Sequence, residues 1–163
     1  MKNVARIWIL IGFFVVTLNG KAAEDDSKSG ISCRTSLRHD SAIGYAIHIV
    51  IQNTGPHEVV FFQDYLPWRS PLLCKVVAIP LGVSESPVLP ITKSVDPTLN
   101  QLTIKPGSQL EGDIVLNKDF EKFDQLIFRK EVGIFWSFTL ENVESERYGR
   151  YSGFFVISPP GSQ

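Results

Sequence analysis

The stretch VGIFWSFTL, residues 132–140, alternates large apolar side chains with a second, more mixed set. Val132, Ile134, Trp136, Phe138 and Leu140 take one set of alternate positions, and Gly133, Phe135, Ser137 and Thr139 take the other. Successive side chains of a β-strand point to opposite faces, so a period of two predicts a strand with one strongly apolar face. Residues 132–140 are therefore predicted to form a strand with Trp136 in the core.

The same period recurs along the chain. Further strands are predicted at 43–51, 58–63, 72–79, 102–104, 110–116 and 151–157. Turn signals separate them, including Asn-Thr-Gly-Pro at 53–56 and Lys-Pro-Gly-Ser at 105–108. About seven to nine short strands joined by turns predict an all-β protein, an antiparallel Ig-like β-sandwich, with a β-barrel as the alternative.

Two segments break the β pattern. Residues 117–130 place apolar side chains such as Phe120 and Phe123 at helical spacing, which predicts one short helix that Asn117 could cap. Residues 81–100 hold three prolines, which cannot donate to a central sheet ladder. This second segment is predicted to be a long surface connection with at most a short edge strand.

Length and composition limit the class of protein. The 163 residues suffice for one domain, which we place at residues 31–160. The chain is 44% hydrophobic and carries 16 Lys+Arg against 17 Asp+Glu. This balance excludes a disordered chain, which combines low hydrophobicity with high net charge. It also argues against nucleic-acid binding, because neutralising phosphates requires a basic excess.

The N-terminus has the layout of a secretory signal peptide. Two basic residues precede an apolar run at 7–18, and small residues follow at Gly20 and Ala22. The run is shorter than the roughly 20 residues that span a bilayer core. Residues 1–22 are therefore predicted to be a signal peptide, with an uncleaved anchor as the alternative, and 23–30 a flexible lead-in. Cleavage removes three of 16 basic residues and no acid, which leaves 13 against 17 and a net charge of −4.

Export predicts a secreted or periplasmic protein with no membrane contact after cleavage. In an oxidising compartment, the chain's two cysteines, Cys33 and Cys74, favour a disulfide. Two buried free thiols are the main alternative, because cysteine packs as a small apolar residue. A metal site has less support, since neither cysteine belongs to a Cys-x-x-Cys motif.

Motifs for catalysis are absent from the sequence. There is no Gly-x-Ser-x-Gly elbow, His-Glu-x-x-His motif or glycine-rich phosphate loop. His39, His48 and His57 are predicted to be ordinary surface residues. The acidic residues of 119–124 are interleaved with a lysine, which favours a solvated helix face over a calcium loop. We therefore predict no catalytic activity, no cofactor and no metal.

The segment QDYLPWRSP, residues 63–71, is the best candidate for binding. It joins two predicted strands and holds Tyr65, Trp68 and Arg69, three residue types enriched in binding hot spots. The alternative is structural: Trp68 could fold back to close the end of the core. Exposure of Trp68 would separate the two interpretations.

Three motifs occur in an order that resembles a known family. They are an Asn-Thr-Gly turn at 53–55, a Leu-Pro corner at 66–67 and a Pro-Gly hairpin bounded by leucines at 102–110. Over roughly residues 42–140 the chain resembles small exported bacterial Ig-like β-sandwich domains, among them the non-catalytic N-terminal domain that precedes deuterolysin-like zinc proteases. No protease motif follows, so the resemblance implies a non-catalytic domain. The spacing of Trp68 to the two cysteines departs from the antibody pattern.

The prediction is an exported, non-catalytic binding module of the cell envelope or extracellular space. Its partner would be another exported protein, and the binding residues would be Tyr65, Trp68 and Arg69. The alternative is an inhibitor of an exported protease, which would present the stiff segment 86–90. A chaperone that offers a sheet edge and a hydrolase with a dispersed site have less support.

Overall fold

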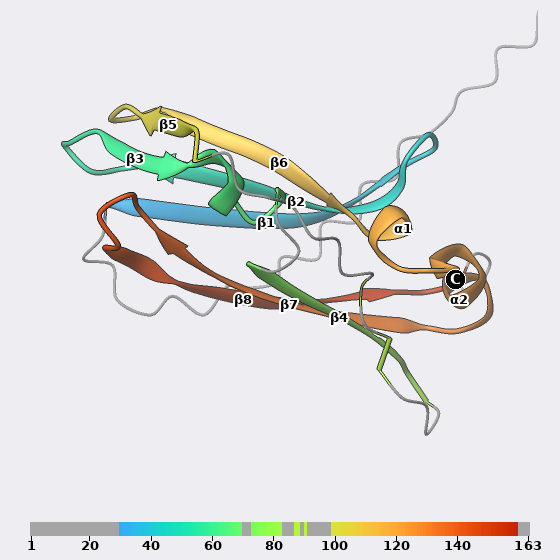
Figure 1. Cartoon of the computed structure of the whole chain (residues 1–163). Helices are drawn as coiled ribbons and strands as arrows, with labels where there is room; N and C mark the ends of the chain where they lie inside the picture. Colours follow the sequence, from blue (N-terminus) through green and yellow to red (C-terminus); the bar gives the residue numbers. More distant parts are fainter. Residues whose placement is uncertain (1–29, 70–72, 83–86, 89, 91–98, 160–163) are drawn as a thin grey trace, which may run out of the picture.

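The computed structural model describes residues 30–69, 73–82, 87–88, 90 and 99–159 (Figure 1). These residues form eight strands: β1 (Ile31–Asp40), β2 (Gly44–Asn53), β3 (Val59–Phe62), β4 (Cys74–Pro80), β5 (Gln101–Ile104), β6 (Gln109–Val115), β7 (Val132–Glu141) and β8 (Arg147–Ile157). They also form a 3₁₀ helix, η1 (Gln63–Tyr65), and two short α-helices, α1 (Leu116–Asp119) and α2 (Phe123–Arg129). The predicted signal peptide and nearly all of the lead-in lie outside the described residues.

The strands form two layers. Every pairing is antiparallel, in sheets of order β1–β2–β6, β3–β5 and β4–β7–β8. Figure 1 shows the first two sheets together in an upper layer and the third sheet in a lower layer that faces it. The predicted all-β class with antiparallel strands is confirmed, and the comparison with Ig-like domains stays a prediction.

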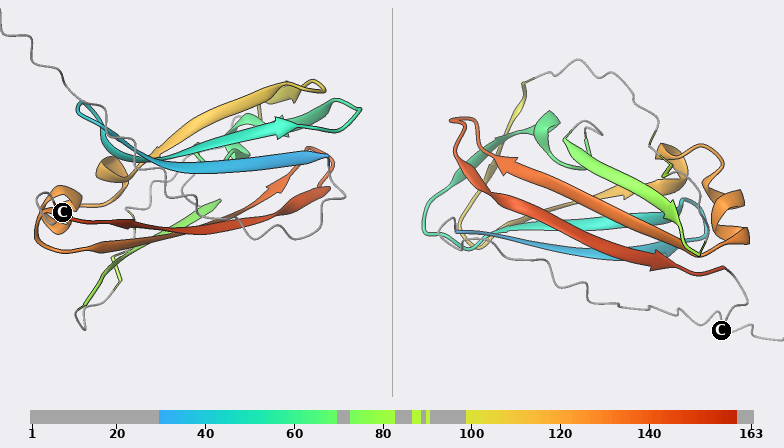
Figure 2. Two further views of the ribbon diagram at one scale, coloured as in Figure 1. Left: turned by 180° about the vertical axis from the view of Figure 1, so that it is seen from behind. Right: turned by 90° about the horizontal axis from the view of Figure 1, so that it is seen from below.

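The core lies between the two layers, which Figure 2 shows from behind and from below. From the upper layer, β2 contributes Ile47, Ile49 and Ile51, all fully buried. From the lower layer, β7 contributes the five apolar residues of its alternating set, including Trp136. Each fully buried side chain of this size stabilises the fold by about 1.5–3 kcal/mol. The strands predicted at 43–51 and 132–140, and the core position of Trp136, are confirmed.

The turn predicted at 53–56 is built around a buried asparagine. Asn53 ends β2 and is 0% exposed. Its side-chain amide donates to the backbone oxygens of His57 at 2.7 Å and Ile104 at 2.9 Å. Its Oδ1 accepts from the Gly55 amide at 3.0 Å. A buried amide with these partners ties the end of β2 to β5 and to the chain that enters β3.

The short helical segment predicted at 117–130 is present, but it is divided into two helices, α1 and α2. Lys122 has a left-handed φ of 57°, and this residue separates α1 from α2. The rings of Phe120 and Phe123 lie on the two sides of the break, both buried, with centroids 5.7 Å apart. Asn117 lies inside α1 and caps no helix; its Oδ1 accepts the Tyr45 amide at 2.7 Å. Packing of both phenylalanines while the chain turns between layers overrides helix propensity here.

The Pro-rich connection at 81–100 is described only in part. Val88 forms an isolated antiparallel bridge with Ala78 of β4, through N–O distances of 2.7 and 3.1 Å. This is the short edge pairing that the sequence predicts. Most of the remaining connection lies outside the described residues. Among the helices that the structure does describe, none has the length and apolarity needed to cross a membrane.

Candidate functional site

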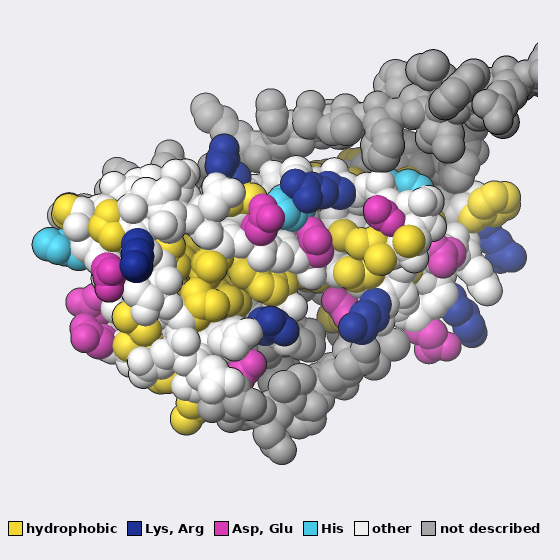
Figure 3. Space-filling model, turned by 90° about the horizontal axis from the view of Figure 1, so that it is seen from above, with side chains coloured by type: hydrophobic (Ala, Val, Ile, Leu, Met, Phe, Trp, Pro, Cys, Tyr) yellow, Lys and Arg dark blue, Asp and Glu magenta, His cyan; other side chains and the backbone are white. Residues whose placement is uncertain are grey.

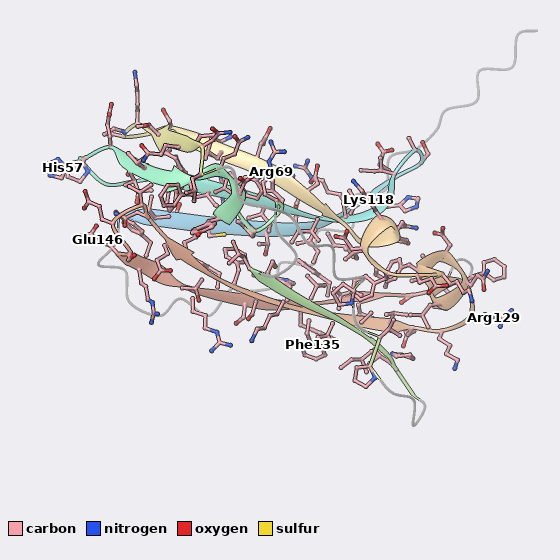
Figure 4. The ribbon with its side chains drawn as sticks, in the orientation of Figure 1. His57, Arg69, Lys118, Arg129, Phe135 and Glu146 are labelled. Carbon is pink, nitrogen blue, oxygen red and sulfur yellow. The ribbon has the colours of Figure 1, made fainter. Side chains whose placement is uncertain are left out.

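The predicted binding residues of the segment 63–71 differ in burial, because Trp68 is packed against the core and Tyr65 and Arg69 are exposed. Trp68 is half-buried against the core, with its ring over the backbone of Gly112 in β6. An ideal Cβ at Gly112 would lie 2.3 Å from the indole Cγ, so the ring fills the space that glycine leaves. Tyr65 is exposed and meets Phe62 edge-on at 5.3 Å between ring centroids. Arg69 is exposed on the turn after Trp68 (Figure 4). The structural alternative for Trp68 therefore gains support, while binding by Tyr65 and Arg69 stays a prediction.

A larger candidate surface is the outer side of the β4–β7–β8 sheet. The strand registers align two apolar rows across it: Val77 with Phe135 and Phe154, and Ile79 with Gly133 and Val156. Their sequence neighbours on each strand point into the core, so these side chains face away from it. We call the surface made by Val77, Ile79, Phe135, Phe154 and Val156 the apolar face.

Two phenylalanines dominate the apolar face. Phe135 is 46% exposed and Phe154 is 39% exposed, and their ring centroids are 4.4 Å apart with the planes tilted by 38°. Figure 4 shows Phe135 pointing away from the lower layer. Phe154 lies over Gly133, where an ideal Cβ would be 2.7 Å from its ring. Because glycine leaves this space, the phenylalanine lies low on the sheet and the face is flat at its centre.

The sequence contains a pattern that indicates this second apolar face, namely large apolar residues at adjacent positions in a strand. In β8, Phe154 and Phe155 are adjacent, and so are Val76 and Val77 in β4. Adjacent large apolar residues in a strand lie on opposite faces of the sheet. A strand in a two-layer protein needs only one apolar face, so these pairs mark a sheet that is apolar on both sides.

The opposite outer surface, on the β1–β2–β6 sheet, is charged. Figure 3 views the molecule from this side and shows acidic, basic and histidine side chains gathered over the layer. His48 of β2 is only 5% exposed, so its prediction as a surface residue is wrong. Its Nδ1 lies 2.8 Å from Asp113 Oδ1, and its Nε2 lies 3.6 Å from Glu111 Oε2. The hydrogen bond with Asp113 of the neighbouring β6 orients the imidazole on the sheet, and its buried Nε2 has no hydrogen-bond partner among the described residues.

The cluster of His48, Glu111 and Asp113 is not arranged as a metal site. Within the described ranges, no group of three or more His, Cys, Asp or Glu side chains is arranged to hold a metal ion. Structural zinc sites in proteins have four ligands, and catalytic ones have three. The cluster of His48, Glu111 and Asp113 is thus described as a polar arrangement on the sheet surface, in which a buried imidazole is hydrogen-bonded to Asp113 and both carboxylates are exposed.

An open cleft of about 390 Å³ lies at the end of the molecule where the turn after β2 meets the β7–β8 turn. Glu58, Glu144, Glu146 and Tyr148 are among its lining residues. Burial is the largest cause that raises the pKa of Tyr148. Asn142 organises the β7–β8 turn, because its Oδ1 accepts the amides of Glu144 and Glu146 at 3.0 and 2.8 Å. The polar groups here shape the turn.

The predicted disulfide does not form in this structure. Cys33 and Cys74 are free thiols on β1 and β4, strands that belong to different layers. Each packs with the core, and burial raises the pKa of each thiol from 9.0 to about 12. A thiol with so high a pKa is a poor nucleophile and a poor metal ligand, since the thiolate is the reactive species. The alternative of two free thiols therefore describes these residues.

The segment of the inhibitor hypothesis, 86–90, lies partly outside the described residues. Where it is described, Val88 is bound to the edge of β4 rather than presented on a free loop. An inhibitory segment must fit a protease cleft from an exposed position. The inhibitor alternative stays a prediction and gains no specific observation here.

Comparisons with known proteins add little. No protein-family model matches the sequence, and no curated protein matches it. The solved structures that match it include two structural-genomics targets. The Northeast Structural Genomics Consortium target SoR45 has 13% identity and a TM-score of 0.38, over 82% of this chain and 88% of its own. A Bordetella pertussis protein provisionally designated ApaA has 11% identity and a TM-score of 0.39, over 81% of this chain and 95% of its own. At these scores neither similarity supports a functional argument.

Proposed function

We propose that this protein is an exported, non-catalytic binding module that holds a protein partner on the apolar face. The observation that carries the proposal is the exposed Phe135–Phe154 pair, set among three further apolar side chains in register across three strands. Contiguous exposed apolar surface costs solubility in a free protein and commonly marks an interaction site. Aromatic residues at its centre are the kind that dominate binding energy.

The proposal places binding on the apolar face, whereas the sequence predicted it at Tyr65, Trp68 and Arg69. Trp68 is engaged by the backbone of Gly112, whereas Phe135 and Phe154 contact each other and solvent. The predicted function, a binding module of the cell envelope or extracellular space whose partner is an exported protein, is kept. The export itself rests on residues 1–22, outside the described residues.

Affinity capture from envelope extract tests the proposal. Tagged protein from an exporting host is compared with the double variant Phe135→Thr/Phe154→Thr, since threonine keeps β propensity and removes the aromatic surface. Phe128→Gln is the matched control, because Phe128 is 71% exposed on α2, away from the face. We expect a protein that is retained by the wild type and by the control and lost by the double variant. Equal capture by all three forms would contradict the proposal, provided that circular dichroism shows each form to be folded.

A further inference from the structure

The ends of the apolar face carry opposite charges. Glu131 continues the outward alternation of β7 at one end, where its Oε1 accepts a hydrogen bond from Ser158 Oγ at 2.9 Å. Arg150 of β8 is exposed at the other end, paired with Thr139 of β7. Each charged residue is four positions from the phenylalanine of its own strand. Because a β-strand rises about 3.3 Å per residue, both charged residues lie about 13 Å from the Phe135–Phe154 row, on opposite sides of it.

This spacing makes the face self-complementary. If a second copy is turned by 180° about an axis along the Phe135–Phe154 row, its phenylalanines meet those of the first copy. The same rotation brings the row of Thr139 and Arg150 in one copy over Glu131 of the other, twice. An isologous twofold interface requires a patch that matches itself in this way. A twofold axis parallel to the strands would instead place Glu131 opposite Glu131.

The shape of the face also favours another sheet as its occupant. On β7 and β8, Gly133 and the serines Ser137 and Ser152 leave only short side chains beside the phenylalanines, while on β4 the exposed Lys75 lies in the row of the two serines, toward the Arg150 end. A helix ligand needs a groove, whereas two flat sheets pack face to face about 10 Å apart with interleaved side chains. We therefore propose, on the basis of the proposed function, that the partner on the apolar face is a second copy of this chain, related by a twofold axis along the Phe135–Phe154 row.

The area of the face sets the strength of this dimer. Three strands about 4.8 Å apart, over the roughly 20 Å from Lys75 to Leu81, give a flat area on the order of 300 Å² per copy. Stable interfaces bury about 1,200–2,000 Å² in total, so this contact, at about 600 Å² for the two copies, falls below that class. We therefore expect a weak and reversible dimer. Its association is measured at protein concentrations up to about 500 μM.

Sedimentation velocity of the purified, host-processed full chain tests the inference. We expect the mean mass to rise from monomer toward dimer with concentration for the wild type and for Phe128→Gln, and to stay monomeric for Phe135→Thr/Phe154→Thr. A monomeric wild type throughout the range would overturn the inference. A dimer that persists in the folded double variant would overturn it as well.

Charge exchange tests the orientation. Glu131→Lys alone and Arg150→Glu alone each place like charges together at both ends of the homodimer, so each is expected to dissociate more readily than the wild type. In an equimolar mixture, the introduced lysine faces the introduced glutamate, and the native Arg150 faces the native Glu131. The mixture is therefore expected to recover association. A mixture that associates no better than its two components would overturn the twofold arrangement.

The two proposals fail separately. If the purified chain is monomeric but capture of a different protein still depends on Phe135 and Phe154, the second-copy inference is wrong and the binding function stands. If neither capture nor self-association of the purified chain depends on the two phenylalanines, the proposed function is wrong at this face.

Discussion

The contact between Trp68 and Gly112 gives a sharp prediction about stability. In Gly112→Ala, the new methyl group would lie 2.3 Å from two atoms of the indole ring, so the ring must move by about 1 Å to reach ordinary contact. Overpacking of this kind costs about 1–3 kcal/mol. Alanine recovers about 0.5–1 kcal/mol relative to glycine because its unfolded chain has less conformational freedom. We therefore expect Gly112→Ala to lower the free energy of unfolding by up to about 2.5 kcal/mol.

The same change should behave differently when the indole is absent. Trp68→Ala alone loses a half-buried aromatic contact, and we expect a cost of about 2–3 kcal/mol. In that background Gly112→Ala meets no ring, so it should be neutral or stabilising by up to about 1 kcal/mol. Urea unfolding, followed by far-UV circular dichroism, measures all four forms of this double-mutant cycle. An identical effect of Gly112→Ala in both backgrounds would refute the placement of Trp68 over Gly112 and restore the indole as a candidate binding residue.

Two further predictions follow from buried polar groups. Asn53→Ala removes the hydrogen bonds to Ile104 and to the turn, including the amide of Gly55, so the free energy of unfolding should fall by about 2–3 kcal/mol; a change below about 0.5 kcal/mol in urea unfolding would contradict this bonding. For Cys33 and Cys74, the raised pKa of about 12 means that stability is fully present below the unfolded-state value of 9.0 and falls as the pH rises from 9.0 toward 12. Labelling of both thiols by a disulfide reagent at pH 8 should be at least about 100-fold slower in the folded protein than in urea, and equal rates would show that the thiols are accessible.

Much of the fold could be predicted from the sequence because the alternation is strong. In β7 and β2 the large apolar residues occupy every second position, and one face of each strand must leave water. The turn around Asn53 could be placed for a similar reason, since Asn, Gly and Pro mark a change of direction. These features are local, and local patterns are what a single sequence displays.

The break in the helical segment and the free state of the two cysteines could not be predicted because both depend on tertiary packing. The break at Lys122 follows from where two phenylalanines must pack, which the helical spacing of 117–130 does not reveal. A bridge between Cys33 and Cys74 requires their Cα atoms to lie about 4.4–6.8 Å apart with the two side chains directed at each other, and the structure keeps both as free thiols on strands of opposite layers. Cysteine count and compartment predict a bridge without testing that geometry.

The apolar face could not be predicted from the sequence for a related reason. Tyr65, Trp68 and Arg69 are residue types that favour binding, but type alone does not show that the Trp68 ring has a glycine opposite to pack on. Phe135 was one member of the weaker alternating set in 132–140, and its importance appears only when the register sets it beside Phe154. A surface made from three strands is visible only once their order is known.

In-cell photo-crosslinking tests the central claim, binding through the apolar face, most directly. A photoreactive phenylalanine analogue is introduced at Phe135, at Phe154, or at the control position Phe128, and adducts of the exported protein are resolved by mass. We expect adducts from positions 135 and 154, either with a second copy or with another protein, and none of the same mass from position 128. Exported, folded protein that forms no adduct from either position of the face, or the same adduct from Phe128, would contradict the account.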